Sequence, residues 1–168
     1  MILDSGNRRE FDTGAVRDIQ EGKGRCDLLP LDVVAGCYSK FTPNESAGMV
    51  FIHIALFVGT GVVGHLYDAL DAFAGFDAWS TMFLEVSKHF EEGHKKYPPT
   101  EDGTPNWKLG IPTHCYIDSA VRHYLKWLRG DTDEDHSRAF VWNIMCCIWT
   151  CAHKPELNDY YKEGESND

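Results

Sequence analysis

Carboxylate, imidazole and amide side chains recur along residues 90–143, where most of the reactive groups of this chain are concentrated. The groups fall in three candidate helices, with Glu91 and Glu92 in one, Asp118 in the next, and His136 and Asn143 in the last. An all-helical protein builds a divalent-metal site in this way, from side chains that project out of several helices into a shared groove. Mg²⁺ and Mn²⁺ prefer carboxylate oxygens, and Mg²⁺ commonly joins a protein to the phosphates of its substrate. The residue types therefore indicate a metal site without specifying its ligands.

The same carboxylates are also placed for simple ion pairs along a helix surface. Glu92 lies four residues from Lys88 and from Lys96, and Asp118 lies four residues from Arg122. Pairs at this spacing face each other on a helix and contribute only about 0.2–0.5 kcal/mol each. Both interpretations of the carboxylates stay open at this point.

The last candidate helix is apolar on nearly every side, so we expect it to be buried. His136, Asn143 and Thr150 follow one another at intervals of seven residues and form a narrow polar stripe on it. Buried polar groups must find hydrogen-bond partners. The stripe indicates either a hydrogen-bond network between helices or a face turned toward a ligand groove.

The N-terminal arm, residues 1–27, is basic and rich in glycine. It holds five of the 16 lysine and arginine residues and is poor in apolar side chains, so it cannot bury enough surface to fold alone. Glycines let backbone N–H groups approach an anion, which makes Lys23 and Arg25 candidates to hold phosphates. Asp27 is a candidate helix cap or an acceptor for a base or ribose. A floppy basic tail is the alternative, although it does not explain the glycine spacing.

Hydrophobic periodicity predicts the helices that position these groups. They comprise a helix that begins after Asp27, one or two apolar helices within 47–76, a helix over 82–97, one that Thr113 can cap and that runs to Arg129, and a last one over about 133–152. No long strand pattern or internal repeat is evident in the sequence. We therefore predict an all-α bundle of about five helices in a single domain, residues 28–155, with an irregular arm at 1–27 and an acidic mobile tail at 156–168.

Composition argues against several classes of protein. The net charge of −10 does not suit a nucleic-acid partner, because phosphate-backbone binding needs a basic surface. Residues 46–67 carry no charged side chain and are long enough to span a bilayer, but His53 and His65 would be costly in hydrocarbon. We expect a core or subunit-interface helix there and no membrane association. The six cysteines form no CxxC pair and the first 25 residues do not resemble a signal peptide, so we expect a reducing cytoplasm.

One motif points elsewhere. Residues 59–64 match the GxGxxG pattern of dinucleotide-binding folds. Such a fold needs several βαβ units, and nothing else in the sequence supplies a second parallel strand. The motif alone is a weak signal, and we do not expect a dinucleotide fold.

Short blocks of polar, glycine and aromatic residues stand out on either side of the apolar segment. They lie at residues 5–9, 13–18, 22–30, 89–93, 106–107, 110–112, 117–123 and 142–143. Taken together, these blocks resemble the dATP/dGTP diphosphohydrolase family of phages and bacteria, the MazZ-like proteins. The resemblance covers residues 5–34 and 82–157.

This resemblance implies a MazG-like all-α nucleotide pyrophosphohydrolase that associates into dimers or tetramers. Such enzymes cleave between the α- and β-phosphates and release a nucleoside monophosphate and pyrophosphate. Their metal signature is a Glu-Glu-x-x-Glu helix and a Glu-x-x-Asp helix. Glu91 and Glu92 match the first two positions, whereas Lys95 occupies the third, and the register of the second helix falls on His136 and Ala139.

We therefore predict a nucleoside triphosphate pyrophosphohydrolase that converts a purine dNTP, dGTP or dATP, to the monophosphate with Mg²⁺ or Mn²⁺. One of the two adjacent glutamates would take the proton of the attacking water. The predicted metal ligands are Glu91, Glu92, Asp118 and His136. The predicted nucleotide-binding residues are Lys23, Arg25, Asp27, Lys95, Arg122 and Asn143. The alternative is a nucleotide-binding or interaction protein of the same helical fold that has lost catalysis, because parts of the metal signature are missing.

Overall fold

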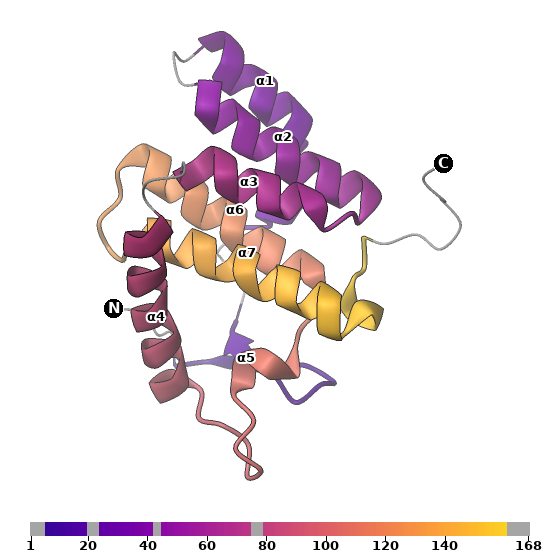
Figure 1. Cartoon of the computed structure of the whole chain (residues 1–168), viewed down its shortest axis with the longest axis vertical. Coiled ribbons are helices and arrows are strands. Elements are labelled where there is room, and N and C mark those ends of the chain that lie inside the picture. The colour runs from indigo at the N-terminus through magenta and orange to yellow at the C-terminus, as the bar shows by residue number, and fades with distance from the viewer. Residues whose placement is uncertain (1–5, 20–23, 42–44, 75–78, 161–168) are drawn as a thin grey trace.

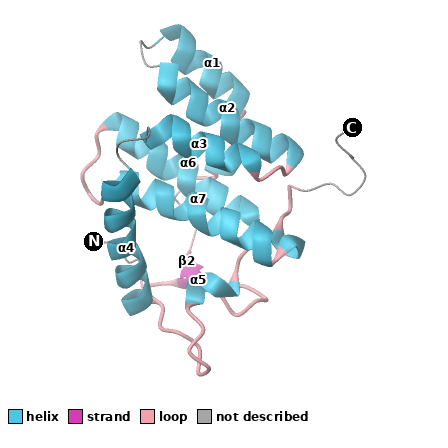
Figure 2. Cartoon of the chain, viewed as in Figure 1, coloured by secondary structure: helices cyan, strands magenta, loops and turns pink. Residues whose placement is uncertain are grey.

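The computed structural model describes residues 6–19, 24–41, 45–74 and 79–160, and helices dominate these segments (Figures 1 and 2). The elements in chain order are β1 (Arg8–Glu10), β2 (Val16–Asp18), α1 (Leu31–Phe41), α2 (Glu45–Thr60), α3 (Gly64–Ala74), α4 (Trp79–Lys96), α5 (Asn106–Leu109), α6 (Thr113–Arg129) and α7 (His136–His153). The predicted all-α class is confirmed. More helices form than the five expected, because the apolar segment divides into α2 and α3 and the loop after α4 contains α5.

Helices α6 and α7 form the centre of the molecule and pack along each other (Figure 1). Helix α6 ends at Arg129 as predicted, where Gly130 follows with a left-handed φ of 84°, and it begins at Thr113, the residue that was expected to cap it. Helix α7 begins at His136 rather than at 133 because the Asp135 side chain accepts a hydrogen bond from the Arg138 N–H at 3.0 Å and caps it. The short turn between them brings the ends of both helices together.

Helices α1, α2 and α3 form a layer against this central pair (Figure 1). The apolar residues of α2 carry the contact, since Phe51 and Phe57 are both 0% exposed and the Phe51 ring lies 5.1 Å from that of Tyr124 in α6. The expected core helix in residues 46–67 is thus confirmed. Within the described residues, no helix is both long and apolar enough to span a bilayer.

The GxGxxG motif joins α2 to α3. Gly59 lies in the last turn of α2, and Gly64 begins α3. A dinucleotide-binding motif of this type follows a β-strand, whereas here a helix precedes it. The motif is a helix-to-helix turn.

The arm that we expected to be irregular contains a small antiparallel hairpin. Arg8 pairs with Asp18 across it, and Gly14, with φ of 78°, makes the turn between the strands. The hairpin is anchored at two points, because Ala15 is 1% exposed and the Thr13 hydroxyl donates to the Gly110 carbonyl at 2.5 Å. The glycine-rich arm therefore takes its shape from the helical domain on which it lies.

Asp27 does not cap a helix that begins at Leu28, as its position in the sequence predicted. It lies in a 3₁₀ turn, Cys26–Leu28, and its carboxylate pairs with Arg25. Helix α1 begins only at Leu31, after Pro30. The proline thus directly precedes the helix instead of occupying its first turn.

The C-terminal segment, as far as residue 160, packs back onto the start of α6. The Asp159 carboxylate accepts the His114 N–H at 3.0 Å and also bonds to the Thr113 hydroxyl, so it caps α6 from a distant position. A Cβ on Gly110 would lie 2.8 Å from the Leu157 side chain, which shows how closely the two segments approach. Residues 161–168 of the predicted tail lie outside the described residues.

Candidate functional site

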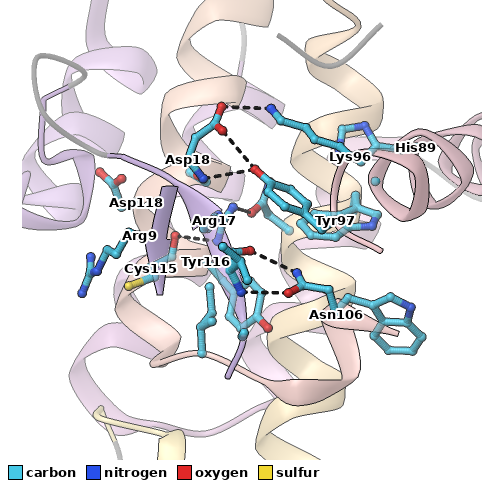
Figure 3. A pocket seen from close by; sticks show the side chains of 18 of the residues that line it. Arg9, Arg17, Asp18, His89, Lys96, Tyr97, Asn106, Cys115, Tyr116 and Asp118 are labelled. Atoms are coloured by element: carbon cyan, nitrogen blue, oxygen red, sulfur yellow. Dashed lines mark hydrogen bonds and ion pairs between the residues drawn. The ribbon is translucent and has the colours of Figure 1, made fainter. Parts of the chain in front are cut away.

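A cavity of about 720 Å³ lies between the N-terminal hairpin and the helices α4, α5, α6 and α7 (Figure 3). Its walls come from segments that are far apart in the sequence, chiefly strand β2, the inner face of α4, the start of α5 and one face each of α6 and α7. Small-molecule sites commonly enclose about 300–1,000 Å³. The cavity is therefore large enough for a nucleotide-sized ligand.

Strand β2 forms one wall of the cavity because a side-chain amide holds it there. Asn106 Oδ1 accepts the Val16 N–H at 2.8 Å, and Asn106 Nδ2 donates to the Val16 carbonyl at 3.1 Å (Figure 3). A primary amide can satisfy both polar groups of one backbone residue in this way. Asn106 begins α5, so this pair of bonds fixes the strand to that helix.

Arg17, the central residue of β2, lies against α6 and α7. Its guanidinium donates to the Cys115 carbonyl at 3.3 Å and to the side-chain oxygen of Asn143, and it lies 5.5 Å from the centre of the Tyr116 ring. Asn143 is only 2% exposed and is itself held by a bond from Nδ2 to the Ala139 carbonyl at 2.8 Å. Within the described residues, Arg17 forms its hydrogen bonds and ring contacts with a carbonyl, an amide and aromatic rings, and none of them is with a carboxylate. The guanidinium is thus a half-buried positive charge without an ion-pair partner among these contacts.

Asp18 gathers charge on the α4 side of the cavity. Its carboxylate accepts from Lys96 Nζ at 2.9 Å and from the Tyr97 hydroxyl at 3.1 Å (Figure 3). It also accepts from Arg8 at 2.9 Å. Burial, followed by the charge of Asp18, raises the pKa of Tyr97 to about 12, so the phenol stays protonated and donates. Asp18 therefore positions a lysine whose side chain is only 8% exposed at the cavity wall.

Aromatic rings from α4, α5 and α7 form another part of the wall. Phe90 lies 5.2 Å from Trp107 and 5.8 Å from Trp142, and His89 lies 5.2 Å from Trp142, measured between ring centres. Burial, followed by the charge of Arg138, lowers the pKa of His89 to about 3, so the imidazole is neutral. His89 Nδ1 and Trp142 Nε1 are buried without a hydrogen-bond partner in the part of the chain that the structure describes. Unsatisfied groups of this kind are costly, and a ligand can satisfy them.

Asp118 lies at the edge of the cavity and is already engaged. The residue is 3% exposed, its Oδ1 accepts the Cys26 N–H at 2.6 Å and its Oδ2 pairs with Arg122. The ion pair with Arg122, one of the two alternatives for this carboxylate, is thus present. Arg122 also donates to the Gly24 carbonyl at 3.4 Å. Together these contacts tie the end of the arm to α6.

A cluster of two imidazoles and a carboxylate lies where α6 approaches the start of α7. His123 Nδ1 is 3.0 Å from His136 Nδ1, and Glu134 Oε1 is 3.4 Å from the former and 3.7 Å from the latter. His136 Nε2 lies 2.8 Å from Asp133, which also pairs with Lys126 at 2.8 Å. Burial, followed by the neighbouring His136, lowers the pKa of His123 to about 2. His123 and Glu134 also line the cavity.

The helices that line the cavity match a known protein family. A family model described as dATP/dGTP diphosphohydrolase, N-terminal, matches residues 77–160, which include α4 to α7. The chain belongs to this family. The match confirms the family that the sequence blocks resembled, and the all-helical architecture is consistent with the MazG-like superfamily. No curated protein and no solved structure matches the chain.

In this diphosphohydrolase-family chain, the adjacent glutamates predicted as metal ligands do not line the cavity. Glu91 is on the surface and pairs with Lys95 at 2.5 Å, with side chains 65% and 71% exposed. Glu92 pairs at 3.1 Å with Arg138, whose side chain is 6% exposed. The roles assigned to Glu91, Glu92 and Lys95 stay predictions.

The other predicted residues divide into two groups. Asp118, Arg122 and Asn143 line the cavity, and His136 adjoins it through His123. Arg25 and Asp27 are bonded to each other at 2.7 Å and lie outside the cavity lining. Lys23 lies outside the described residues. The structure thus brings the second and third helices of the predicted constellation together at one site.

Several residues that the structure places at the cavity received no role from the sequence. Arg17 and Asn106 make the contacts that shape the wall, and His89, His123 and Glu134 supply further polar groups. For all of them except Glu134, the available signal was their presence inside the blocks that carry the family resemblance. Periodicity could not reveal them, because their partners are distant in the sequence.

Three groups of side chains within the described residues are chemically suited to hold a metal ion. One is the cluster of His123, Glu134 and His136, and a second replaces the first two by Asp131 and Asp133. The third, His53, His65 and Asp68, lies between α2 and α3, away from the cavity. Imidazole and carboxylate together suit divalent transition ions. The family's expected metal therefore finds suitable donors beside the cavity.

Proposed function

We propose that this chain hydrolyses a purine deoxynucleoside triphosphate, dGTP or dATP, to the monophosphate and pyrophosphate within the cavity. The contacts of Arg17 carry the proposal, because they hold a guanidinium at the cavity wall with a carbonyl, an amide and an aromatic ring and with no carboxylate among the described partners. Such a charge favours an anionic ligand, and guanidinium can bind phosphate oxygens with two parallel hydrogen bonds. Local charge of this kind attracts a triphosphate even to a chain whose net charge is −10.

The aromatic wall supports a nucleobase as the other part of the ligand. Phe90 and Trp142 present ring surface to the cavity. Stacking of a base on an aromatic side chain contributes about 1–3 kcal/mol. The unsatisfied His89 Nδ1 and Trp142 Nε1 offer hydrogen bonds to the base or sugar. We therefore place the base against α4 and α7 and the phosphates toward β2 and α6.

In this reaction water attacks the α-phosphorus, and the bond to the bridging oxygen breaks so that pyrophosphate leaves with the electron pair. Negative charge develops on the phosphate oxygens, and fixed cations stabilise it. Arg17 and Arg122 line the cavity at its β2 and α6 walls, and Lys96 is held there by Asp18. We assign these three cations to the triphosphate.

A divalent ion, Mg²⁺ or Mn²⁺, belongs to the proposal. When bound, such an ion neutralises phosphate charge and lowers the pKa of a coordinated water. Glu134 lines the cavity and His136 is beside it, so these residues would hold the ion close to the phosphates, whereas Asp118, the other predicted ligand at the cavity, is engaged by Arg122 and the Cys26 N–H. Glu91 and Glu92, the ligands and proton acceptor expected from the family signature, compete with them for this assignment.

Product identification tests the proposal directly. The protein is incubated separately with dATP, dGTP, dCTP and dTTP in Mg²⁺ and in Mn²⁺, and the products are resolved by chromatography. We expect dAMP or dGMP with pyrophosphate, and little turnover of the pyrimidine nucleotides. Release of orthophosphate and a diphosphate, or no turnover at all, would contradict the α–β cleavage.

A nucleotide-binding protein without catalysis is the second candidate function. It is favoured by the incomplete metal signature, in which Lys95 replaces the third glutamate. Calorimetric titration with dGTP separates the two candidates, since binding without products at any metal concentration would support the second. Both candidates predict that Arg17→Met weakens binding.

We also propose that the chain forms dimers or tetramers, as the resemblance implies. Exposed apolar side chains in the first turns of α4 support this, because Phe83 and Leu84 are 51% and 67% exposed. Adjacent exposed apolar residues are candidates for burial in a subunit interface. Light scattering after size exclusion should give a mass of two or four chains, and Leu84→Glu should lower it.

A further inference from the structure

Three ligand atoms converge between α6 and α7 with the spacing of a metal coordination sphere. His123 Nδ1 and His136 Nδ1 are 3.0 Å apart, and Glu134 Oε1 lies 3.4 and 3.7 Å from them. Ligands bound at about 2.0–2.1 Å in a tetrahedral site lie about 3.4 Å from one another. The three observed separations surround that value, so an ion fits between these atoms with small adjustments of the side chains.

A carboxylate orients one of the imidazoles for this role. His136 Nε2 lies 2.8 Å from Asp133, and Lys126 in turn holds Asp133 at 2.8 Å. Imidazoles that bind metals almost always donate their other N–H to a carboxylate, carbonyl or water, which fixes the tautomer. A proton on Nε2 leaves the lone pair on Nδ1, which faces His123 and Glu134. This contact is independent of the spacing of the three ligand atoms.

The competing group of donors beside the cavity is already neutralised. It would use His136 Nε2 with Asp131 and Asp133. Arg129 pairs with Asp131 and Lys126 pairs with Asp133, so an ion there would displace two cations from their carboxylates. The group formed by His123, Glu134 and His136 needs no such exchange.

We propose that His123, Glu134 and His136 bind one transition-metal ion, and that its open coordination position faces the cavity. Three protein ligands leave a position for water or substrate in catalytic sites. His123 and Glu134 line the cavity, so that position is accessible to a ligand within it. Two imidazole ligands favour a later transition ion such as Co²⁺ or Zn²⁺ over Mg²⁺, which prefers oxygen. The use of this ion in hydrolysis rests on the proposed function, whereas its binding does not.

The metal-binding experiment must exclude a second site. His53 and His65 lie 3.7 and 3.8 Å from Asp68, and these three side chains could also take a transition ion. Every protein in the titration therefore carries His65→Gln. This change removes one of the donors between α2 and α3 and touches nothing at the cavity.

Metal-free protein is titrated with Co²⁺, and binding is followed through the visible absorption of the bound ion. We expect one equivalent to bind with the intense bands of a tetrahedral or five-coordinate site, and Mg²⁺ in large excess not to displace it. His123→Gln should remove the bands and weaken binding by more than about 100-fold, and Asp133→Asn should weaken it by about 10–100-fold. His153→Gln, which changes an exposed histidine of the same helix, is the matched control and should leave the spectrum unchanged.

The outcomes separate this inference from the proposed function. Equal Co²⁺ affinity and spectra with and without His123→Gln would overturn the inference, as would displacement by Mg²⁺. A hydrogen bond between the two imidazoles would then account for their contact. Co²⁺ binding that depends on His123, with no hydrolysis of any dNTP, would instead leave the metal site standing and remove the proposed function. Circular dichroism of each variant establishes that the helices are retained.

Discussion

The two faces of α4 carry different chemistry, although both are rich in polar residues. On the outer face, Glu91 and Lys95 pair with each other in solvent. On the inner face, His89, Phe90 and Lys96 line the cavity. Neighbouring residues on a helix point about 100° apart, so adjacent positions can belong to opposite environments. Carboxylates that look like a pair in the sequence need not share a site, and groups without a recognisable motif can do so.

The largest effect on activity is expected from a substitution at the cavity. Arg17→Met should lower kcat/KM for the preferred dNTP by about 10²–10³-fold, because it removes a fixed cation from the phosphate site. Lys88→Met on the outer face, where the lysine pairs only with Glu85 at 2.5 Å among its described contacts, is the matched control and should change kcat/KM less than about twofold. Steady-state kinetics of both variants provide the measurement. Similar kinetics for the two variants would remove Arg17 from the site.

The sequence could predict the helices better than the short strands that pack against them. Helix α6 was predictable to within one residue, since its amphipathic period, Pro112 before it and Gly130 after it are all local signals. The hairpin was not, because strands of three residues are too short for a pattern and depend on Asn106 for their position. Local preferences do not determine which distant segment completes a hydrogen bond.

The same limit explains the candidate site. Arg17 and Asn143 are bonded although far apart in the sequence, and no spacing rule connects them. Asp118 was expected either in a shared groove or in a surface ion pair with Arg122, and it lies at the cavity with that ion pair formed and the arm packed over it. Amphipathicity indicates which face is polar, and only the packing of other segments decides what that face meets.

Glu92 lies between the two faces of α4, and replacing it can distinguish a structural role from a catalytic one. Glu92→Gln should lower the free energy of unfolding by about 1–3 kcal/mol, because the buried Arg138 loses its carboxylate. Urea denaturation and product assays on the same preparation test this. Loss of turnover at unchanged stability would instead support the metal-ligand role predicted from the family signature.

The inner face also predicts a pH dependence of stability. The folded state lowers the pKa of His89 from 6.5 to about 3, so the unfolded chain binds its proton more readily. The contribution of His89 is fully present above about pH 6.5 and falls by up to about 1.4 kcal/mol per pH unit as the pH drops toward 3. Urea unfolding at several pH values should show a smaller loss for His89→Gln than for the wild-type chain. Parallel pH profiles would mean that His89 is not buried in this way.

A smaller effect on substrate binding is expected from Asn106, which holds the cavity wall formed by β2. Asn106→Ala removes both hydrogen bonds to Val16 and should loosen β2 without changing the helices. Hydrogen exchange of residues 8–18 should become faster, and KM should rise by about tenfold, since each neutral hydrogen bond contributes about 0.5–1.5 kcal/mol. Asn158→Ala removes side-chain hydrogen bonds to the Gly61 carbonyl, the Thr113 hydroxyl and the Tyr160 N–H, none of which lines the cavity, and is the control. Unchanged exchange in the hairpin would show that other contacts position it.

The smallest effect should come from the most conspicuous residue of the sequence motif. Glu91→Gln removes a carboxylate that is 65% exposed and whose described contact is the ion pair with Lys95. Exposed pairs at this spacing contribute about 0.3–0.5 kcal/mol, so unfolding and turnover should both stay close to those of the wild-type chain. A large loss of turnover with intact stability would reverse the comparison of the two faces. Since the cavity does not reach Glu91 within one chain, such a loss would point to a site completed by a second subunit packed against the outer face of α4.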